Sequence, residues 1–111
     1  MAKYPSIAIT TKNGFRLIDA SDIMYCQAEG HRTRLYLIEN KMMEVNKKLK
    51  EVGELLGEET FARIHHSTII NLAHLKEYIN GPSNLVRMSD GSELAVSTRR
   101  KGELIKKFIR I

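Results

Sequence analysis

Cysteine, tryptophan and proline are scarce in this chain of 111 residues, which has one cysteine, no tryptophan and two prolines. A single cysteine cannot form an internal disulfide, and there is no CxxC pair of the kind that binds zinc. Cys26 lies in an apolar run over residues 23–28. We therefore expect it to be a buried small side chain rather than a redox or nucleophilic group.

Long apolar segments are also absent. No run approaches the roughly 18 apolar residues that a membrane helix needs, and the N-terminus has no apolar segment typical of a signal peptide. Hydrophobic residues make up 42% of the chain and charged residues 28%, which is ordinary for a soluble globular protein. We expect one cytoplasmic domain, residues 1–111, with no membrane contact.

Patterns that carry catalysis or bind metal are lacking as well. Ser67 beside His66 is not a catalytic triad, and neither a GxSxG elbow nor a glycine-rich phosphate loop is present. His65 and His66 are adjacent, so on a strand they would point to opposite faces and could not easily share one ion. His74 has no acidic or thiolate partner at a zinc-site spacing. We predict no enzymatic activity, no metal and no cofactor.

Positive charge exceeds negative charge: 18 Lys and Arg residues stand against 13 Asp and Glu residues, a formal net charge of +5. The basic residues are concentrated at 30–50 and 97–111, with an acidic block at 51–59 between them. Such a patchy distribution favours a polyanionic partner, nucleic acid first and an anionic membrane surface second.

Most of the chain is predicted to form short strands separated by turn signals. Asn13-Gly14 joins strands at 6–10 and 15–18, and Asp90-Gly91 joins strands at 85–88 and 93–96. Further strands are expected at 23–28, 34–38, 42–45, 61–65 and 75–79. Because long helices do not alternate with these strands, parallel βαβ units are not expected.

Two helices complete the prediction. Asn46 is a candidate N-cap for a helix over 47–56, and Gly57 suits the position just past its end. Ser97 or Thr98 can cap a last helix whose inward-facing residues are Leu104, Ile105, Phe108 and also Ile109. The expected fold is mostly β, with short strands in small packed antiparallel sheets, one mid-chain helix and one C-terminal helix.

The segment 61–72 combines apolar alternation with an unusual density of hydrogen-bonding side chains. Phe61 and Ile64 supply core surface, while Arg63, His66 and Ser67 are donors or acceptors that a purely structural strand would seldom gather. His65 alternates with His66, so it is expected to face inward or to be hydrogen-bonded within the fold. The segment therefore predicts a strand, or a strand and turn, that presents a contact surface.

Two other segments favour nucleic acid. The loop at 29–34 offers guanidinium, imidazole and hydroxyl groups, which can bond base edges or phosphates. A solvated basic turn is the alternative interpretation. Thr98–Lys101 opens the last helix, where backbone N–H groups and basic side chains favour an anion. Cations in a first turn oppose the helix dipole, which suggests a partner rather than a merely soluble surface.

These segments resemble the LytTR family of bacterial DNA-binding domains. The pieces occur in the family's order: 22–25 leading to 28–31, Lys48-Leu49 opening a helix, 61–72, and 89–97 as the closing hairpin. The resemblance implies small packed sheets, with loops rather than a recognition helix entering successive major grooves and bending the duplex. It also implies binding to tandem imperfect repeats upstream of promoters.

By position, the resemblance assigns a first contact loop to Gly30–Arg34, a second contact to His66 and a third to the residues after the closing hairpin. His65 matches the signature histidine and is expected to be a framework residue. The family commonly has Val-Ser-Arg, whereas this chain has Val96-Ser97-Thr98-Arg99. Either Arg99 makes the contact from one position later, which we favour, or Thr98 makes a weaker one.

The predicted function is a sequence-specific, double-stranded DNA-binding domain of a transcriptional response regulator. A receiver domain in the full-length protein and a homodimer on tandem repeats are candidate partners. The alternatives are a protein-interaction module that uses exposed strand edges and an RNA-binding domain, which the 6% aromatic content disfavours. The predicted DNA-contact residues are His31, Arg32, Thr33, Arg34, Lys47, Lys48, His66, Ser67, Thr98, Arg99, Arg100 and Lys101.

Overall fold

Short antiparallel strands dominate the computed structural model, which describes residues 4–111. These residues form ten strands, two α-helices and two single-turn 3-10 helices, so the predicted mostly-β fold with a mid-chain and a C-terminal helix is confirmed. The elements are β1 (Ser6–Thr11), β2 (Gly14–Asp19), η1 (Ala20–Asp22), β3 (Ile23–Glu29), β4 (Arg32–Leu37), β5 (Lys41–Val45), α1 (Leu49–Leu56), β6 (Phe61–His65), β7 (Thr68–Asn71), η2 (Leu72–His74), β8 (Leu75–Ile79), β9 (Leu85–Met88), β10 (Glu93–Ala95) and α2 (Thr98–Ile105). None of the helices within 4–111 is long and apolar enough to cross a membrane.

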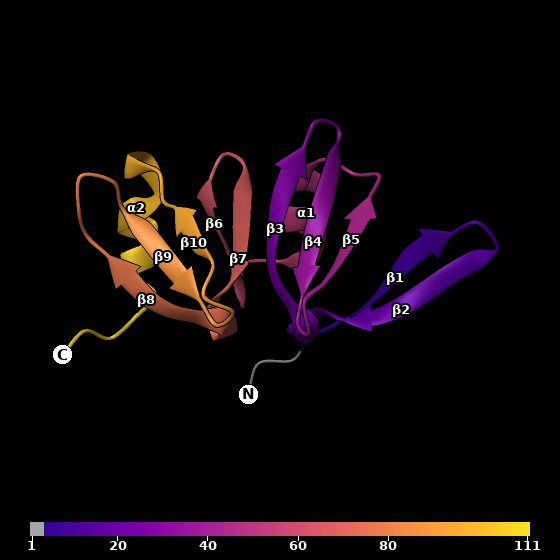
Figure 1. Cartoon of the computed structure of the whole chain (residues 1–111), viewed down its shortest axis with the longest axis horizontal. Coiled ribbons are helices and arrows are strands. Elements are labelled where there is room, and N and C mark those ends of the chain that lie inside the picture. The colour runs from indigo at the N-terminus through magenta and orange to yellow at the C-terminus, as the bar shows by residue number, and fades with distance from the viewer. Residues whose placement is uncertain (1–3) are drawn as a thin grey trace.

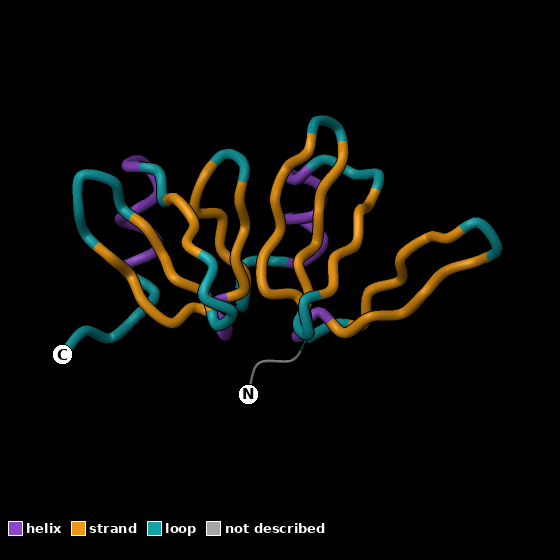
Figure 2. Tube along the Cα trace, viewed as in Figure 1, coloured by secondary structure: helices purple, strands orange, loops and turns teal. Residues whose placement is uncertain are grey.

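Three antiparallel sheets are spread along the longest axis of the molecule, which measures 48 Å (Figures 1 and 2). The central sheet has five strands in the order β5-β4-β3-β7-β6. The β1–β2 hairpin projects at one end, and the β10-β9-β8 sheet lies at the other beside α2. The hairpins at Asn13-Gly14 and Asp90-Gly91 are confirmed.

The central sheet is covered on both faces, and this explains the unbroken apolar run in β3. Ile23 and Cys26 belong to one hydrophobic cluster with α1, while Met24 and Tyr25 belong to a second cluster with β9, β10 and α2. Strands buried on both faces read as continuous apolar runs rather than as alternation. Cys26 is fully buried as predicted, and burial raises the pKa of its thiol to about 12.

Helix α1 begins later than the sequence predicted. Its N-cap is Lys48 rather than Asn46, and the Val52 N–H donates to the Lys48 carbonyl at 3.1 Å. The carbonyl of Lys47 is already engaged, because it accepts the Thr33 hydroxyl at 2.8 Å. The bond from Thr33 therefore holds Lys47 outside the helix, although the sequence pattern alone placed Lys47 in the first helical turn. Gly57 ends the helix with a φ of 81°, as predicted.

Helix α2 begins as expected, but it ends at Ile105, earlier than the sequence predicted. Ser97 is the N-cap, and its carbonyl accepts the N–H groups of Arg100 and Lys101, both at 3.1 Å. Leu104 is buried and Ile105 is half-buried. Phe108 and Ile109 are 44% and 95% exposed, so the prediction that they face inward is wrong, because the helix ends at Ile105 and both residues lie beyond it.

The segment after β6 forms a strand of its own. Residues Thr68–Asn71 turn back as β7, which pairs with both β6 and β3, so His66 and Ser67 form the turn of a hairpin. A register shift between Arg63 and His65 marks a β-bulge in β6. Of the two readings left open by the sequence, strand and turn is the one observed.

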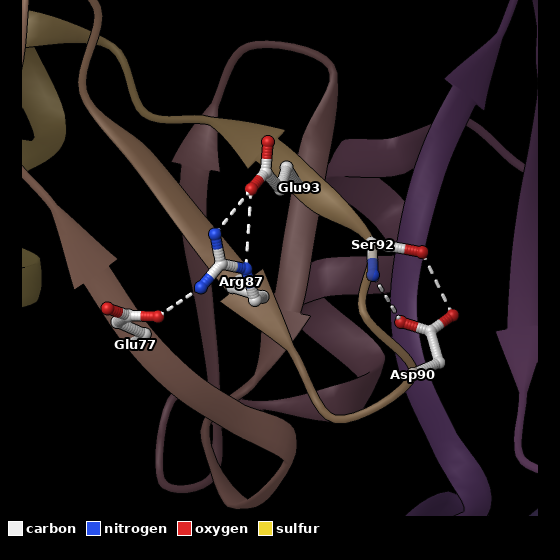
Figure 3. Close-up of polar contacts among 5 residues, drawn as sticks. All are labelled: Glu77, Arg87, Asp90, Ser92 and Glu93. Carbon is white, nitrogen blue, oxygen red and sulfur yellow. Dashed lines mark hydrogen bonds and ion pairs between the residues drawn. The ribbon is translucent and has the colours of Figure 1, made fainter.

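The outer face of the β8–β9–β10 sheet carries a three-residue ion-pair row (Figure 3). Arg87 in β9 lies directly opposite Glu77 in β8 and Glu93 in β10, and its guanidinium bonds both carboxylates. Cross-strand pairs of opposite charge favour one register. In the adjoining turn, the Asp90 carboxylate accepts the backbone N–H and the hydroxyl of Ser92, each at 2.9 Å.

Asn71 in β7 bonds residues at the N-terminal end of the chain as well as its own neighbour, and its replacement should lower stability. It is fully buried; its amide nitrogen donates to the Ile23 carbonyl at 2.9 Å, and its oxygen accepts from the Tyr4 hydroxyl and the Ala73 N–H. We expect Asn71→Ala to lower the free energy of unfolding by about 2 kcal/mol, because it leaves buried polar groups without their partner. Urea denaturation measures this, with the exposed Asn80→Ala as control. Equal stability of the two variants would contradict it.

Candidate functional site

The predicted contact residues come from four segments that the fold places on one edge of the molecule. These are the β3–β4 turn, the β5–α1 connection, the β6–β7 turn and the start of α2, all at the top of Figures 1 and 2. The β4–β5 turn and the Asp90-Gly91 turn lie at the opposite edge. The edge with the four segments is hereafter the loop edge.

Hydrogen bonds between neighbouring segments hold the loop edge together. The Thr33 hydroxyl donates to the Lys47 carbonyl at 2.8 Å, joining β4 to the β5–α1 connection. The Ala28 N–H donates to the Ser67 carbonyl at 2.9 Å, joining β3 to the β6–β7 turn. The Ser97 N–H donates at 2.9 Å to the carbonyl of Ile64, the residue at the β6 bulge, and so joins α2 to β6. The four segments are therefore fixed relative to one another.

Four residues at the β3–β4 turn, 31–34, were predicted to contact DNA, and two of them are exposed. Gly30 has a φ of 62° and precedes His31 in a two-residue loop, which is the glycine-first arrangement of a type II′ hairpin. His31 and Arg32 are exposed. Arg34 is half-buried and pairs with Glu44 at 3.2 Å and with Glu29 at 3.6 Å.

Thr33 differs from the prediction. Its side chain is fully buried, and its hydroxyl is used by the Lys47 carbonyl. Alternation along β4 explains this, because Thr33 points into the same side as the buried Leu35, while Arg32 and Arg34 point outward. Thr33 therefore stabilises the loop edge from inside the fold and is not exposed to a partner. Lys47 and Lys48, which it helps to place, are both exposed.

The β6–β7 turn contains the densest polar network on the loop edge. Arg63 donates from Nε to the His65 carbonyl at 3.0 Å and from Nη2 to the His66 carbonyl. His65 Nδ1 accepts the Ser67 N–H at 3.2 Å and lies 2.9 Å from the Ser67 hydroxyl. Arg63, His65 and Ser67 are half-buried, whereas His66 is exposed. The framework role predicted for His65 agrees with these bonds.

The two histidine rings do not point to opposite faces, contrary to the prediction. Their centroids are 4.5 Å apart with an interplanar angle of 36°. His66 lies in the turn, beyond the end of β6, so strand alternation no longer applies to it. Within residues 4–111, no group of three or more His, Cys, Asp or Glu side chains is arranged to hold a metal ion.

Positive charge gathers where the β6–β7 turn meets α2. Burial, followed by the charges of His66, Arg100 and Arg63, lowers the pKa of His65. Burial and the nearby Arg100 also lower the pKa of Arg63. Thr98 and Arg99 are exposed, while Arg100 and Lys101 are half-buried. No ion pair within 4–111 involves Arg63, Arg99 or Arg100. This part of the edge is suited to an anion.

Arg63 is the residue whose part in the site the sequence did not reveal. The prediction counted it among the polar side chains of a presented strand, but its donors face the backbone of its own turn. No hairpin signal was available, because His66 and Ser67 are not among the glycine, asparagine and aspartate pairs that mark two-residue turns.

Three comparisons with known proteins agree. The family model of the LytTr DNA-binding domain matches residues 13–109. Two curated relatives are both called sensory transduction protein LytT. The one from Oceanobacillus iheyensis is 29% identical over 101 residues, covering 88% of this chain and 41% of the relative. The one from Bacillus subtilis is 28% identical over 108 residues, covering 95% and 44%. This chain therefore spans less than half the length of these relatives.

A solved structure has the same fold. It is the LytTr DNA-binding domain of a Bacillus cereus protein described as a methyl-accepting/DNA response regulator. The TM-score is 0.77 at 25% identity, and the match covers 91% of this chain and 94% of the solved chain.

The pH dependence of stability tests the placement of His65. Its pKa lies below the ordinary value of 6.5 in the folded chain, so as the pH falls through 6.5 the unfolded chain binds a proton that the folded chain resists. The free energy of unfolding should therefore decrease as the pH is lowered from 6.5 toward the pKa of His65 in the folded chain. Urea denaturation between pH 5 and 8 measures this.

The matched control is His65→Asn, which keeps an acceptor near the Nδ1 position but does not titrate. Its free energy of unfolding should depend less on pH than that of the wild type over the same range. Parallel curves for the two proteins would contradict the prediction.

Proposed function

Since the chain belongs to the LytTR family of DNA-binding domains, we propose that it is the sequence-reading domain of a bacterial response regulator that controls transcription. In this proposal the loop edge lies against duplex DNA, and its turns enter successive major grooves. The observation that carries it is the gathering of four basic or polar segments from distant parts of the sequence on one edge.

The arrangement of the four segments supports contact with more than one groove. They lie in a row along the longest axis of the molecule (Figure 1), in the order start of α2, β6–β7 turn, β3–β4 turn and β5–α1 connection. The major groove is about 12 Å wide and admits a turn as well as a helix. A row of separate turns can therefore follow the groove past an intervening backbone.

We assign two kinds of contact along the loop edge. Arg32, Arg34, His66 and Arg99 are the proposed base readers, because guanidinium and imidazole groups bond base edges directionally. Arg99 is exposed without an acidic partner within 4–111, which supports it over Thr98. The ion pairs of Arg34 with Glu29 and Glu44 lie at the surface, where solvent screens them, so they are weak. DNA can therefore compete for this side chain.

The proposed phosphate contacts flank these readers; they are Lys47, Lys48, Arg100 and Lys101. His31 and Ser67 would lie at the borders of the two sets, with His31 exposed and Ser67 half-buried. The relatives named as sensory transduction proteins are more than twice as long as their matched segments. That length supports a receiver domain as a partner in a full-length protein, with homodimers forming on tandem promoter repeats.

A protein-interaction module is the second candidate, and one observation favours it. Within residues 4–111, strand β2 pairs with β1 alone, and it exposes Phe15 and Leu17 at 66% and 62%. An open strand edge with exposed apolar side chains can pair with a partner's strand. Binding through it would persist at high salt, whereas binding to DNA phosphates weakens steeply.

Selection from random duplexes tests the proposed function directly. The domain is mixed with random-sequence DNA, the bound pool is amplified, and the cycle is repeated at several salt concentrations. We expect enrichment of a repeated motif whose affinity falls steeply with salt, because phosphate contacts release counterions. Salt-sensitive binding without enrichment would mean that the basic edge attracts DNA but does not read it.

Single substitutions separate the readers from the phosphate contacts. Arg99→Ala should weaken binding to the selected site by about 1–3 kcal/mol and relax specificity, while Lys101→Gln should weaken all sequences alike and reduce the salt slope by about 1. Fluorescence anisotropy with selected and random duplexes measures both effects. Lys41→Gln is the control, since Lys41 begins β5 beside the β4–β5 turn on the opposite edge. Equal loss on both duplexes for Arg99→Ala would remove its reading role.

A further inference from the structure

We infer that Arg63 and His65 are positioning residues that lock the β6–β7 turn from beneath and thereby direct His66 toward DNA; this deepens the proposed function and rests on it. The two side chains form one clamp on the backbone of the turn. The clamp consists of the side chains of Arg63 and His65, and His66 is the residue that it presents.

The turn needs such support because its backbone lacks the usual hairpin geometry. His65 pairs with Thr68, which leaves His66 and Ser67 as a two-residue loop. Loops of this length normally adopt type I′ or II′ turns, which require a positive φ and match the twist of the strands. The non-glycine residues with positive φ within 4–111 are Glu39 and Asn40, so this turn belongs to neither type. Its conformation therefore depends on bonds from side chains.

Arg63 supplies the first half of the clamp. Its planar guanidinium donates to two successive carbonyls, those of His65 and His66, in a fork that a lysine cannot reproduce. The ion-paired arginines within 4–111 are Arg32, Arg34 and Arg87, and each pairs with a glutamate. Arg63 is committed to the turn instead. A charged donor strengthens hydrogen bonds to carbonyls, which suits a half-buried position.

His65 supplies the second half. A backbone N–H can only donate, so the 3.2 Å contact from the Ser67 N–H makes His65 Nδ1 an acceptor. The ring is therefore neutral and carries its proton on Nε2. Its lowered pKa agrees with this state. Together, the two side chains bond one N–H and two carbonyls of residues 65–67, while the ring of His66 lies 4.5 Å from that of His65.

Arg63 could instead touch a phosphate itself, and a double-mutant cycle distinguishes the two roles. Arg63→Lys keeps the charge but removes the fork. If Arg63 acts through His66, this change should weaken binding to the selected duplex about as much as His66→Ala, on the order of tenfold. The double variant should then bind no more weakly than either single variant. Binding to random duplexes should stay unchanged.

The clamp is also measured without DNA. Hydrogen exchange at the Ser67 N–H should accelerate about tenfold or more in Arg63→Lys while the thermal midpoint of the whole domain barely changes, because only the turn loosens. Arg16→Lys is the matched control, since Arg16 is exposed on β2 and has no ion pair within 4–111. As a second test, His65→Asn should retain selected-site binding through its acceptor oxygen, and His65→Ala should lose it.

Two results would overturn the inference. Unchanged exchange at the Ser67 N–H in Arg63→Lys would show that there is no clamp. Multiplicative losses in the double variant, together with weaker binding to random DNA, would make Arg63 a phosphate contact. Failure of the proposed function would be seen separately, as wild-type protein that enriches no sequence, because the exchange measurement does not involve DNA.

Discussion

The pairing of β3 with β7 is the constraint on which the rest of the structure depends. Only Tyr25–Ile70, Cys26–Ile69 and Gln27–Thr68 are aligned across it, yet it extends the β3–β4–β5 meander with the β6–β7 hairpin and gives both hydrophobic clusters a shared sheet. The same pairing continues upward into the bond between the Ala28 N–H and the Ser67 carbonyl. The register that builds the core therefore also sets the β3–β4 and β6–β7 turns side by side.

Along the loop edge, buried and exposed polar side chains have different contacts. Half-buried or buried side chains such as Arg63, His65 and Thr33 bond the backbone beneath the turns. Long cations such as Lys47 and Arg99 extend from the surface. Rigid turns reduce the ordering cost of binding, whereas flexible cations bring charge at little cost in stability. An edge built in this way combines turns held by bonds to their backbone with cations that extend into solvent.

Sequence reasoning succeeded where a residue type has one local consequence and failed where the outcome depended on distant contacts. Asn13-Gly14 and Asp90-Gly91 mark hairpins because their backbones suit tight turns, and the apolar spacing of α1 marks a helix. The start of α1 depends on Thr33, sixteen residues before Leu49, and the exposure of Phe108 follows from where α2 ends. In the site, the segments were predictable, but the depth of Thr33 and the direction of the Arg63 donors were not, since both depend on bonds that no local pattern encodes.

Three of the four segments of the loop edge are held by different devices. Gly30 supplies the positive φ of the first turn, Arg63 and His65 bond the second from beneath, and Ser97 attaches the start of α2 to the carbonyl that the β6 bulge leaves free. The devices share the central sheet as their base but rest on different residues. Substitutions at sites without shared partners act nearly independently. The exposed residue of one segment can therefore change with little effect on the bonds that hold the other segments, and the fold is kept.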